Sequence, residues 1–240
     1  NKLVSLIDDI DTLLYFENNN QPTVSLVAKV GGGIGDIYGT VWDKNDAGQH
    51  LVTDTGRAVE SAANNYLGNA QPDWLAGWSN SFYYKNFSLN VLIDGRFGGV
   101  VYSGDSSRLD SYGVSERSLQ YRESGVVLDA VDPNGAANTV NITGQEYWQR
   151  LSDIAEPYVY AQDNVRLREL AIGYSFPDVS ALGMESINLQ LIGRNLFFIN
   201  KKAEDIDPEA ALGTNLGGQG IALGNLPTLR SIGLNVTLKF

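Results

Sequence analysis

The sequence predicts an all-β protein built from antiparallel strands, and three observations support this fold class. The last twelve residues alternate strictly between apolar and polar side chains, which is typical of a strand with two unlike faces. Glycine is frequent, at 26 of 240 residues, and Asn, Asp and Ser lie between the aromatic runs. The connections between the predicted strands alternate between short turns and long loops, which favours the strands of a transmembrane β-barrel.

The final strand is expected over residues 229–240. One face carries the apolar side chains of Ile232, Leu234, Val236, Leu238 and Phe240. Its length fits a tilted membrane-spanning strand of about 9–11 residues. A soluble sandwich strand shows the same alternation, so this segment alone leaves both structures open.

Composition excludes several classes of protein. The chain has 28 acidic and 17 basic residues, a net charge of −11, which argues against nucleic acid as a partner. It has no cysteine, so neither disulfides nor thiolate metal sites are possible. No apolar run reaches the length of about 18 residues that a membrane helix needs. Residues 1–7 resemble the end of a strand and the only methionine is Met184, so we expect a fragment of a longer protein.

The first half of the chain contains several predicted strands. A short strand is expected over 23–30, and residues 36–42 and 49–53 are expected to form a hairpin around the polar loop 43–48. Residues 74–84 and 87–97 both alternate. Only Lys85 and Asn86 connect them, so these two strands are predicted to be antiparallel neighbours.

The second half contains two long loops between further strands. Residues 99–163 form a polar stretch with one predicted helix, which begins at the capping box of Thr143 and Glu146. A strand is expected over 164–176 with a bulge near Glu169, then a turn over 178–185 and a strand over 187–193. The loop 200–228 is expected to contain a helical turn that begins at Asp207.

Short and long connections therefore alternate, at 85–86, 99–163, 178–185 and 200–228. Outer-membrane barrels have short periplasmic turns and long extracellular loops, whereas a sandwich gives no reason for such an order. The pattern favours the barrel.

A series of short motifs resembles the SusC/RagA family of TonB-linked outer-membrane transporters. The motifs occur in order over nearly the whole chain, at 35–39, 67–74, 82–89, 166–177, 193–197, 207–209 and 227–240. Many relatives carry a fuller Asp-rich, Gly-Asp-Gly loop where this chain has only Asp43 to Gly48.

The resemblance implies a plugged barrel of about 22 strands, of which residues 1–240 form the C-terminal part without the plug domain. It implies energised import of oligosaccharides or peptides at the outer membrane and a SusD-like surface lipoprotein as partner. Contact with TonB is expected through N-terminal parts absent from this chain. The loops 99–163 and 200–228 are expected to be extracellular. The alternative from another class is a soluble β-sandwich that binds carbohydrate.

Aromatic and acidic residues of the 99–163 loop are the candidates for contact with ligand or partner, because aromatic rings offer flat apolar faces and carboxylates accept hydrogen bonds. They are Tyr102, Tyr112, Tyr121, Tyr147, Trp148, Asp105 and Asp110, with Glu123 nearby. They can form a ligand wall, a surface that faces the lipoprotein, or the small core of the loop itself. Five aromatic residues are predicted to face lipid, namely Trp74, Trp78, Phe82, Tyr84 and Phe87.

Catalysis is not expected. His50 is the only histidine, which excludes a two-histidine metal site, and no Gly-x-Ser-x-Gly motif occurs. The glycine-rich run 31–35 lacks the residues of a phosphate loop and predicts a loop or bulge. Asp43, Asn45 and Asp46 are weak candidates for Ca²⁺, the alternative being an ordinary turn, and no cofactor is expected.

The apolar residues of the last strand have a second predicted role. By resemblance to outer-membrane proteins, Leu234, Val236, Leu238 and Phe240 form the signal that the barrel-assembly machinery recognises. The same residues also close the sheet as a structural strand, and both roles are compatible.

Overall fold

The computed structural model describes residues 2–7, 10–18, 22–177, 179, 181, 183–213, 215 and 217–240. The chain divides into two compact units. The sheet unit contains residues 72–98, 162–209 and 226–240, and the mixed unit contains residues 1–71, 99–161 and 210–225. Each unit is described by itself.

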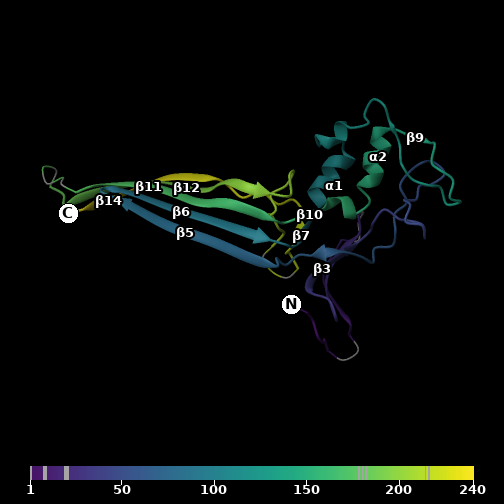
Figure 1. Cartoon of the computed structure of the whole chain (residues 1–240), viewed down its shortest axis with the longest axis horizontal. Coiled ribbons are helices and arrows are strands. Elements are labelled where there is room, and N and C mark those ends of the chain that lie inside the picture. The colour runs from purple at the N-terminus through teal and green to yellow at the C-terminus, as the bar shows by residue number, and fades with distance from the viewer. Residues whose placement is uncertain are drawn as a thin grey trace. The chain divides into compact units, whose positions relative to one another are not determined.

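The sheet unit is one antiparallel sheet of five long strands, drawn as long arrows in Figure 1. The strand order is β14-β12-β11-β6-β5. The strands are β5 (Trp74–Tyr84), β6 (Phe87–Phe97), β11 (Asn164–Phe176), β12 (Ser186–Lys201) and β14 (Ser231–Lys239). The all-β antiparallel fold that the alternation predicts is therefore confirmed.

Two local features of this sheet are confirmed as predicted. Lys85 and Asn86 alone connect β5 to β6, and Lys85 adopts a left-handed conformation with φ of 53° that lets the chain reverse. The register of β11 shifts between Leu167 and Glu169 against both neighbouring strands, which is the bulge expected near Glu169. Of the turn 178–185, residues 178, 180 and 182 lie outside the described residues, and Val179 pairs with Met184.

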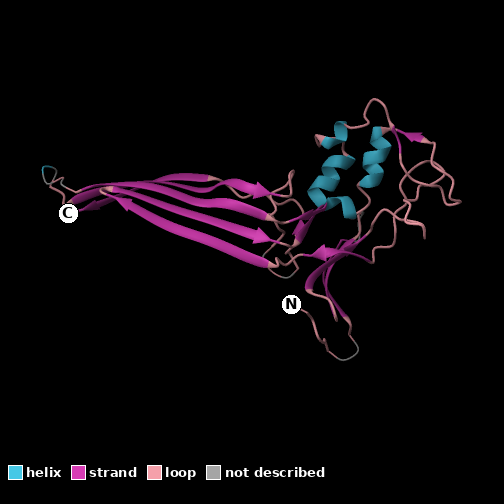
Figure 2. Ribbon diagram, in the orientation of Figure 1, coloured by secondary structure: helices cyan, strands magenta, loops and turns pink. Residues whose placement is uncertain are grey.

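The mixed unit contains short strands and two α-helices, shown in cyan in Figure 2. A four-stranded antiparallel sheet has the order β1-β2-β3-β4, and smaller sheets are β10-β7-β13 and β8-β9. The strands are β1 (Thr12–Asn18), β2 (Val24–Lys29), β3 (Ile34–Gly39), β4 (Asn65–Asn69), β7 (Val100–Ser103), β8 (Val126–Val127), β9 (Asn141–Ile142), β10 (Val159–Ala161) and β13 (Ile221–Ala222). The helices are α1 (Gly104–Ser111) and α2 (Gly144–Leu151), with 3-10 turns η1 (Arg117–Leu119) and η2 (Glu156–Tyr158).

Helix α2 is the helix that the sequence predicts. The Thr143 side chain accepts from the Glu146 amide at 3.2 Å, and Glu146 accepts from the Thr143 amide at 3.1 Å. The sequence analysis missed α1, which Ser103 caps by accepting from the Ser106 amide. Its sequence has one large apolar residue, Leu109, which is exposed, so no helical periodicity is visible.

The core of the mixed unit joins segments that are far apart in the sequence. Fully buried residues from β2, β3, β7, η2 and β13 form one cluster, namely Val24, Leu26, Ile37, Ala70, Tyr102, Ala155, Tyr158 and Ile221. Residues 99–161 are therefore folded into this unit, because they supply residues to its core.

Three predicted elements differ from the structure. Strand β3 ends at Gly39 and pairs with β2 and β4, so the expected hairpin is reduced to a bridge between Lys44 and His50. Residues 207–209 form a turn instead of a helix, because ion pairs hold the carboxylates at both ends of this turn on the sheet. Residues 2–7 are not a strand, although Leu3 bonds to the backbone of Gly31 and Gly32.

Candidate functional site

The five-stranded sheet has one continuous apolar face. In an antiparallel sheet, residues that lie opposite one another share a face. The register places apolar residues opposite one another in all five strands, in one row Phe82, Leu89, Ile172, Leu191 and Leu234, and in the next row Tyr84, Phe87, Tyr174, Leu189 and Val236. Many of these side chains are exposed, including Phe82 at 50%, Leu191 at 53% and Leu234 at 67%. The face is therefore apolar and uncovered within the sheet unit.

Aromatic residues gather at both ends of this apolar face. At the turn end, Phe87 contacts Tyr174 edge-to-face with ring centroids 4.7 Å apart, and Tyr174 contacts Phe176 in the same way. At the other end, Trp74 stacks on Phe97 at 4.0 Å. This arrangement matches the two aromatic girdles that flank the lipid-facing band of outer-membrane barrels.

The spacing of the two aromatic ends fits a bilayer. Phe87 and Phe97 lie at the two ends of β6, ten residues apart. Ten residues of antiparallel strand extend about 34 Å, and a tilt of about 40° reduces this to a height of about 26 Å. The apolar band of an outer-membrane barrel is about 25 Å tall.

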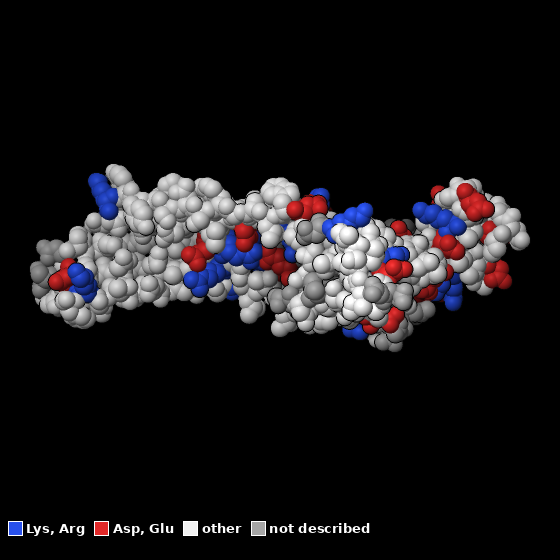
Figure 3. Space-filling model, turned by 90° about the horizontal axis from the view of Figure 1, so that it is seen from below, with Lys and Arg blue, Asp and Glu red and all other residues white. Residues whose placement is uncertain are grey.

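The opposite face of the sheet is polar. Its rows contain mainly small and polar residues: one row is Ser81, Asn90, Ala171, Ile192 and Gly233, and the next is Tyr83, Ser88, Gly173, Gln190 and Asn235. In Figure 3 the charged side chains of the sheet gather toward its two ends and leave a long uncharged stretch between them. One face apolar and one polar is the arrangement of strands that separate lipid from a water-filled lumen.

The larger of the two charged groups of the sheet is an ion-pair network, which connects residues 207–209 to β11. The Arg168 guanidinium binds both oxygens of Asp94, at 2.7 and 3.0 Å, and donates to Glu209 at 2.6 Å. Arg166 donates to Glu209 at 2.8 Å and lies 3.7 Å from Asp207. Asp207 also accepts from the amides of Glu209 and Thr228, and these hydrogen bonds lower its pKa against the opposing effect of burial. Forked, charge-assisted contacts of this kind are strong and fix geometry.

Sequence reasoning missed this network as a functional feature. Arg166, Arg168 and Glu209 fall within motifs of the family resemblance, but their pairing joins residues about forty positions apart. The sequence contains one signal for this network. Arg166 and Arg168 alternate with apolar neighbours, which places both guanidinium groups on the polar face.

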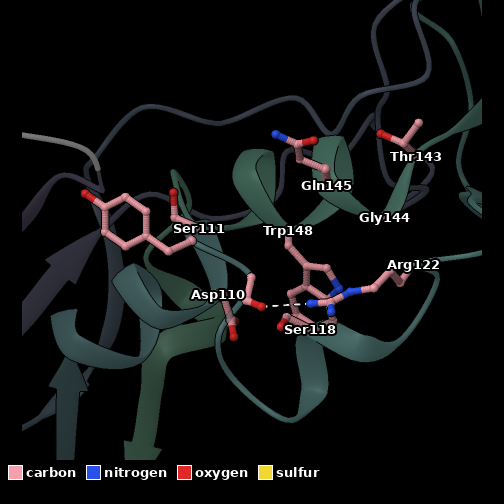
Figure 4. Close-up of a pocket in the computed structure, with 10 residues that line it drawn as sticks. Asp110, Ser111, Ser118, Arg122, Thr143, Gly144, Gln145 and Trp148 are labelled. Carbon is pink, nitrogen blue, oxygen red and sulfur yellow. Dashed lines mark hydrogen bonds between the residues drawn. The ribbon is translucent and has the colours of Figure 1, made fainter.

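The mixed unit contains a pocket of about 460 Å³ among the end of α1, η1 and the start of α2 (Figure 4). Arg122 extends over it and donates to the Gly113 carbonyl at 2.8 Å. The pocket also contains three predicted contact residues, Asp110, Tyr112 and Trp148. Of these only Tyr112 is strongly exposed, at 79%. Tyr112 is therefore the predicted residue best placed to meet a ligand or a partner.

Asp110 is the centre of a buried polar network. It is 1% exposed, and its carboxylate accepts from Ser115 at 2.5 Å, from Tyr158 at 2.9 Å and from Arg117 at 3.0 Å. The second oxygen lies 2.6 Å from another nitrogen of Arg117. Burial, reinforced by the Asp110 charge, raises the pKa of Tyr158 far above its usual range, which keeps this phenol a donor. Asp110 therefore connects helix α1 to Ser115, Arg117 and Tyr158 by side-chain contacts.

The other predicted contact residues have mainly structural surroundings. Tyr102 is fully buried in the core, and burial raises its pKa strongly. Asp105 accepts from the Gly224 amide with both oxygens, at 2.8 and 2.9 Å. Tyr121 and Tyr147 contact each other edge-to-face at 5.3 Å. These residues therefore contact other residues of the mixed unit.

The weak metal candidates form a turn. The Asn45 side chain accepts from the amides of Ala47 and Gln49, both at 3.0 Å, and Asp43 accepts from the Lys44 amide. Over the described ranges, no group of three or more His, Asp or Glu side chains has an arrangement that could hold a metal ion. His50 is partly buried and lies against Trp42 with ring centroids 4.3 Å apart, instead of being exposed in a loop.

The residues of the predicted assembly signal lie on the apolar face of β14. Leu234, Val236, Leu238 and Phe240 are between 46% and 80% exposed. In the described part of the chain β14 pairs only with β12, so its other edge is open. The described helices include none that is long and apolar enough to cross a bilayer.

Comparison with curated proteins identifies relatives over most of the chain. It is 25% identical over 222 residues to TonB-dependent receptor P3 of Formosa agariphila, covering 88% of this chain and 21% of that receptor. It is 26% identical over 185 residues to TonB-dependent receptor P26 of the same organism, covering 71% and 17%. The chain therefore spans about a fifth of the length of these relatives. No protein-family model matches it.

Comparison with solved structures shows the same fold over the whole chain. The RagAB peptide importer in its closed-closed state superposes with a TM-score of 0.62 at 14% identity, over 99% of this chain and 26% of that chain. The open-open state gives a TM-score of 0.58 at 15% identity, over 99% and 25%. This likeness to solved structures concerns the fold alone. The chain is therefore similar in sequence to TonB-dependent receptors over most of its length, and similar in fold to part of the RagAB peptide importer.

Proposed function

We propose that this chain forms part of the barrel wall of an outer-membrane nutrient importer. The observation that carries the proposal is the two-faced sheet, whose apolar face is exposed between two aromatic ends at a spacing that fits a bilayer. The polar face with its ion-pair network lines the aqueous lumen. Closure of these strands with others into a complete barrel of about 22 strands is part of this proposal.

The alternative of a soluble carbohydrate-binding sandwich fits the sheet poorly. A sandwich packs two apolar faces against each other about 10 Å apart. Here Trp74, Phe82 and Phe87 are each at least half exposed, and no second sheet of this unit covers them in the described residues. An uncovered apolar face of this size needs lipid or a partner.

The whole importer is proposed to take up oligosaccharides or peptides with energy supplied through TonB. The similar TonB-dependent receptors and the RagAB peptide importer support this activity. The plug and the contact with TonB belong to parts of the receptor other than this chain. We assign no catalytic step to these residues, because the relatives are receptors and importers.

We further propose that the loops 99–163 and 200–228 face the cell exterior and that a SusD-like surface lipoprotein docks there. The support is that these loops supply much of the folded mixed unit, whose pocket presents the exposed Tyr112 next to Arg122. In this proposal the remaining predicted contact residues stabilise the fold of the unit that carries this surface.

The test is to express the full-length receptor that contains this chain and fractionate the cells. The proposal predicts a protein in the outer membrane that changes its gel migration on heating and co-purifies with a surface lipoprotein. A receptor found in the soluble fraction would refute the barrel, and one in the membrane without a lipoprotein would refute the docking partner only.

A further inference from the structure

A cavity of about 570 Å³ lies in the sheet unit, where the end of β12 meets residues 206–207 and 227–230. Its lining includes three cations, Arg166, Lys201 and Arg230, and among the described residues only one carboxylate, Asp207. This excess of positive charge is unusual for the chain as a whole, whose net charge is −11. A cavity of this volume is large enough for a small ligand group.

Arg166 is the buried cation of the cavity. It is 3% exposed, and its guanidinium lies 4.3 Å from the centre of the Phe198 ring. One of its terminal nitrogens contacts Glu209 and Asp207, but its Nε donor is buried and has no hydrogen-bond partner within the described chain. Buried donors are almost always satisfied in folded proteins, so this one indicates a missing acceptor.

Lys201 is held in place without losing its charge. Its ammonium donates to the carbonyls of Glu204 and Ile206, at 2.6 and 3.1 Å. An ammonium has three donors, so one remains after these two contacts. No carboxylate of the described residues forms an ion pair with it, and the neutral carbonyls leave its charge uncompensated.

Arg230 is the accessible cation of the cavity. It is exposed, and it makes no hydrogen bond or ion pair with any residue that the structure describes. A free guanidinium offers a planar fork that matches the two oxygens of a carboxylate. The nearby side chains of Phe197, Phe198 and Pro227 supply apolar contacts beside it.

We propose that this cavity binds a carboxylate group of the nutrient, with Arg230 as the recognising residue, Lys201 as a supporting charge and the Nε of Arg166 as a further donor. The proposal rests on the import function proposed above and narrows its substrate class to acidic peptides or acidic oligosaccharides. Both sources supply the same chemical group, so the geometry accounts for either one.

The test measures binding to the purified full-length receptor in detergent. Triglutamate and trigalacturonate serve as acidic probes, with N-acetylated, C-amidated triglutamine and galactotriose as counterparts without a carboxylate, at low ionic strength. The variant is Arg230→Gln. The matched control is Lys239→Gln, which removes the same charge from the distant Lys239–Glu185 pair at the other end of β14. Arg230→Lys tests whether the fork matters beyond the charge.

We expect Arg230→Gln to weaken binding of at least one acidic probe about tenfold, the order lost with a charge-assisted hydrogen bond. The neutral probes and the Lys239→Gln receptor should be unaffected, and Arg230→Lys should lie between. The acidic probe that binds identifies the source of the carboxylate. Equal losses for Arg230→Gln and Lys239→Gln would overturn the proposal. So would a heat-modifiable outer-membrane receptor that binds neither acidic probe, a result that leaves the import function itself standing.

Discussion

Leu191 offers the sharpest test of the lipid-facing surface. It lies on the apolar face between Ile172 and Leu234 and is 53% exposed. In water, an exposed leucine can be replaced by arginine with a change in stability within about 0.5 kcal/mol. If the face contacts lipid, the same substitution places a charge in hydrocarbon. Leu191→Arg therefore distinguishes the two environments.

The expected cost follows from the depth of Leu191. It lies four residues from Ile187, where the apolar face of β12 begins. Four residues extend about 14 Å, or about 10 Å of depth at a tilt of about 40°. This depth is close to the middle of an apolar band about 25 Å tall, where arginine costs about 2–4 kcal/mol. The folded receptor should lose about 2 kcal/mol or more, roughly thirtyfold in the ratio of folded to unfolded protein.

The control is the neighbouring substitution Gln190→Arg. Gln190 lies on the polar face opposite Gly173 and Asn235, where an added charge faces the lumen. The measurement is guanidinium unfolding of the full-length receptor in phospholipid vesicles, together with the heat-modifiable fraction in cells. Leu191→Arg should reduce both, and Gln190→Arg should reduce neither. If the two variants unfold within about 0.5 kcal/mol of each other, the lipid-facing assignment is wrong.

Three further predictions concern the mixed unit. Replacing Asp110 with Asn removes the buried charge that pairs with Arg117, so the unit should lose about 3 kcal/mol and become sensitive to limited proteolysis. The pKa of Glu146 is lowered to about 2 by Arg57 and by hydrogen bonds from its capping box, so its contribution to stability is complete above about 4.5. That contribution is lost as the pH falls from about 4.5 toward 2, and amide exchange at the start of α2 should accelerate over this window; an unchanged rate would contradict the assignment. Tyr112→Ala should leave thermal stability unchanged, because the side chain is 79% exposed, yet reduce co-purification with the lipoprotein; retained co-purification would exclude Tyr112 from the docking surface.

The long strands could be predicted from the sequence because their information is local. Alternation of side chains over 74–84 and 87–97 sets which residues share a face, and the two-residue connection sets the pairing. The bulge near Glu169 and the helix at Thr143 were also visible, since a phase change and a capping box each lie within a few residues. These features needed no knowledge of distant contacts.

The mixed unit and the site could not be predicted in the same way. Its core joins residues from 24 to 221, and such long-range packing leaves no periodic pattern in any one segment. For this reason the sequence left open whether Tyr102 and Asp110 contact a ligand, contact a partner or form a core of the loop, and only the fold shows that both are buried. The same aromatic and acidic residue types occur at surfaces and in cores where their polar groups are hydrogen-bonded. Only the partners of these side chains distinguish the two locations.

The sequence by itself therefore determined the strand class, the two-faced sheet and the likeness to SusC/RagA transporters. The tertiary structure decided which charges meet. Arg166 and Arg168 bind Glu209 across some forty residues, while Arg230 is left without a partner among the described residues. The reason is physical: the face of a side chain depends on its local backbone phase, whereas the pairing of charges depends on loops that return from far along the chain.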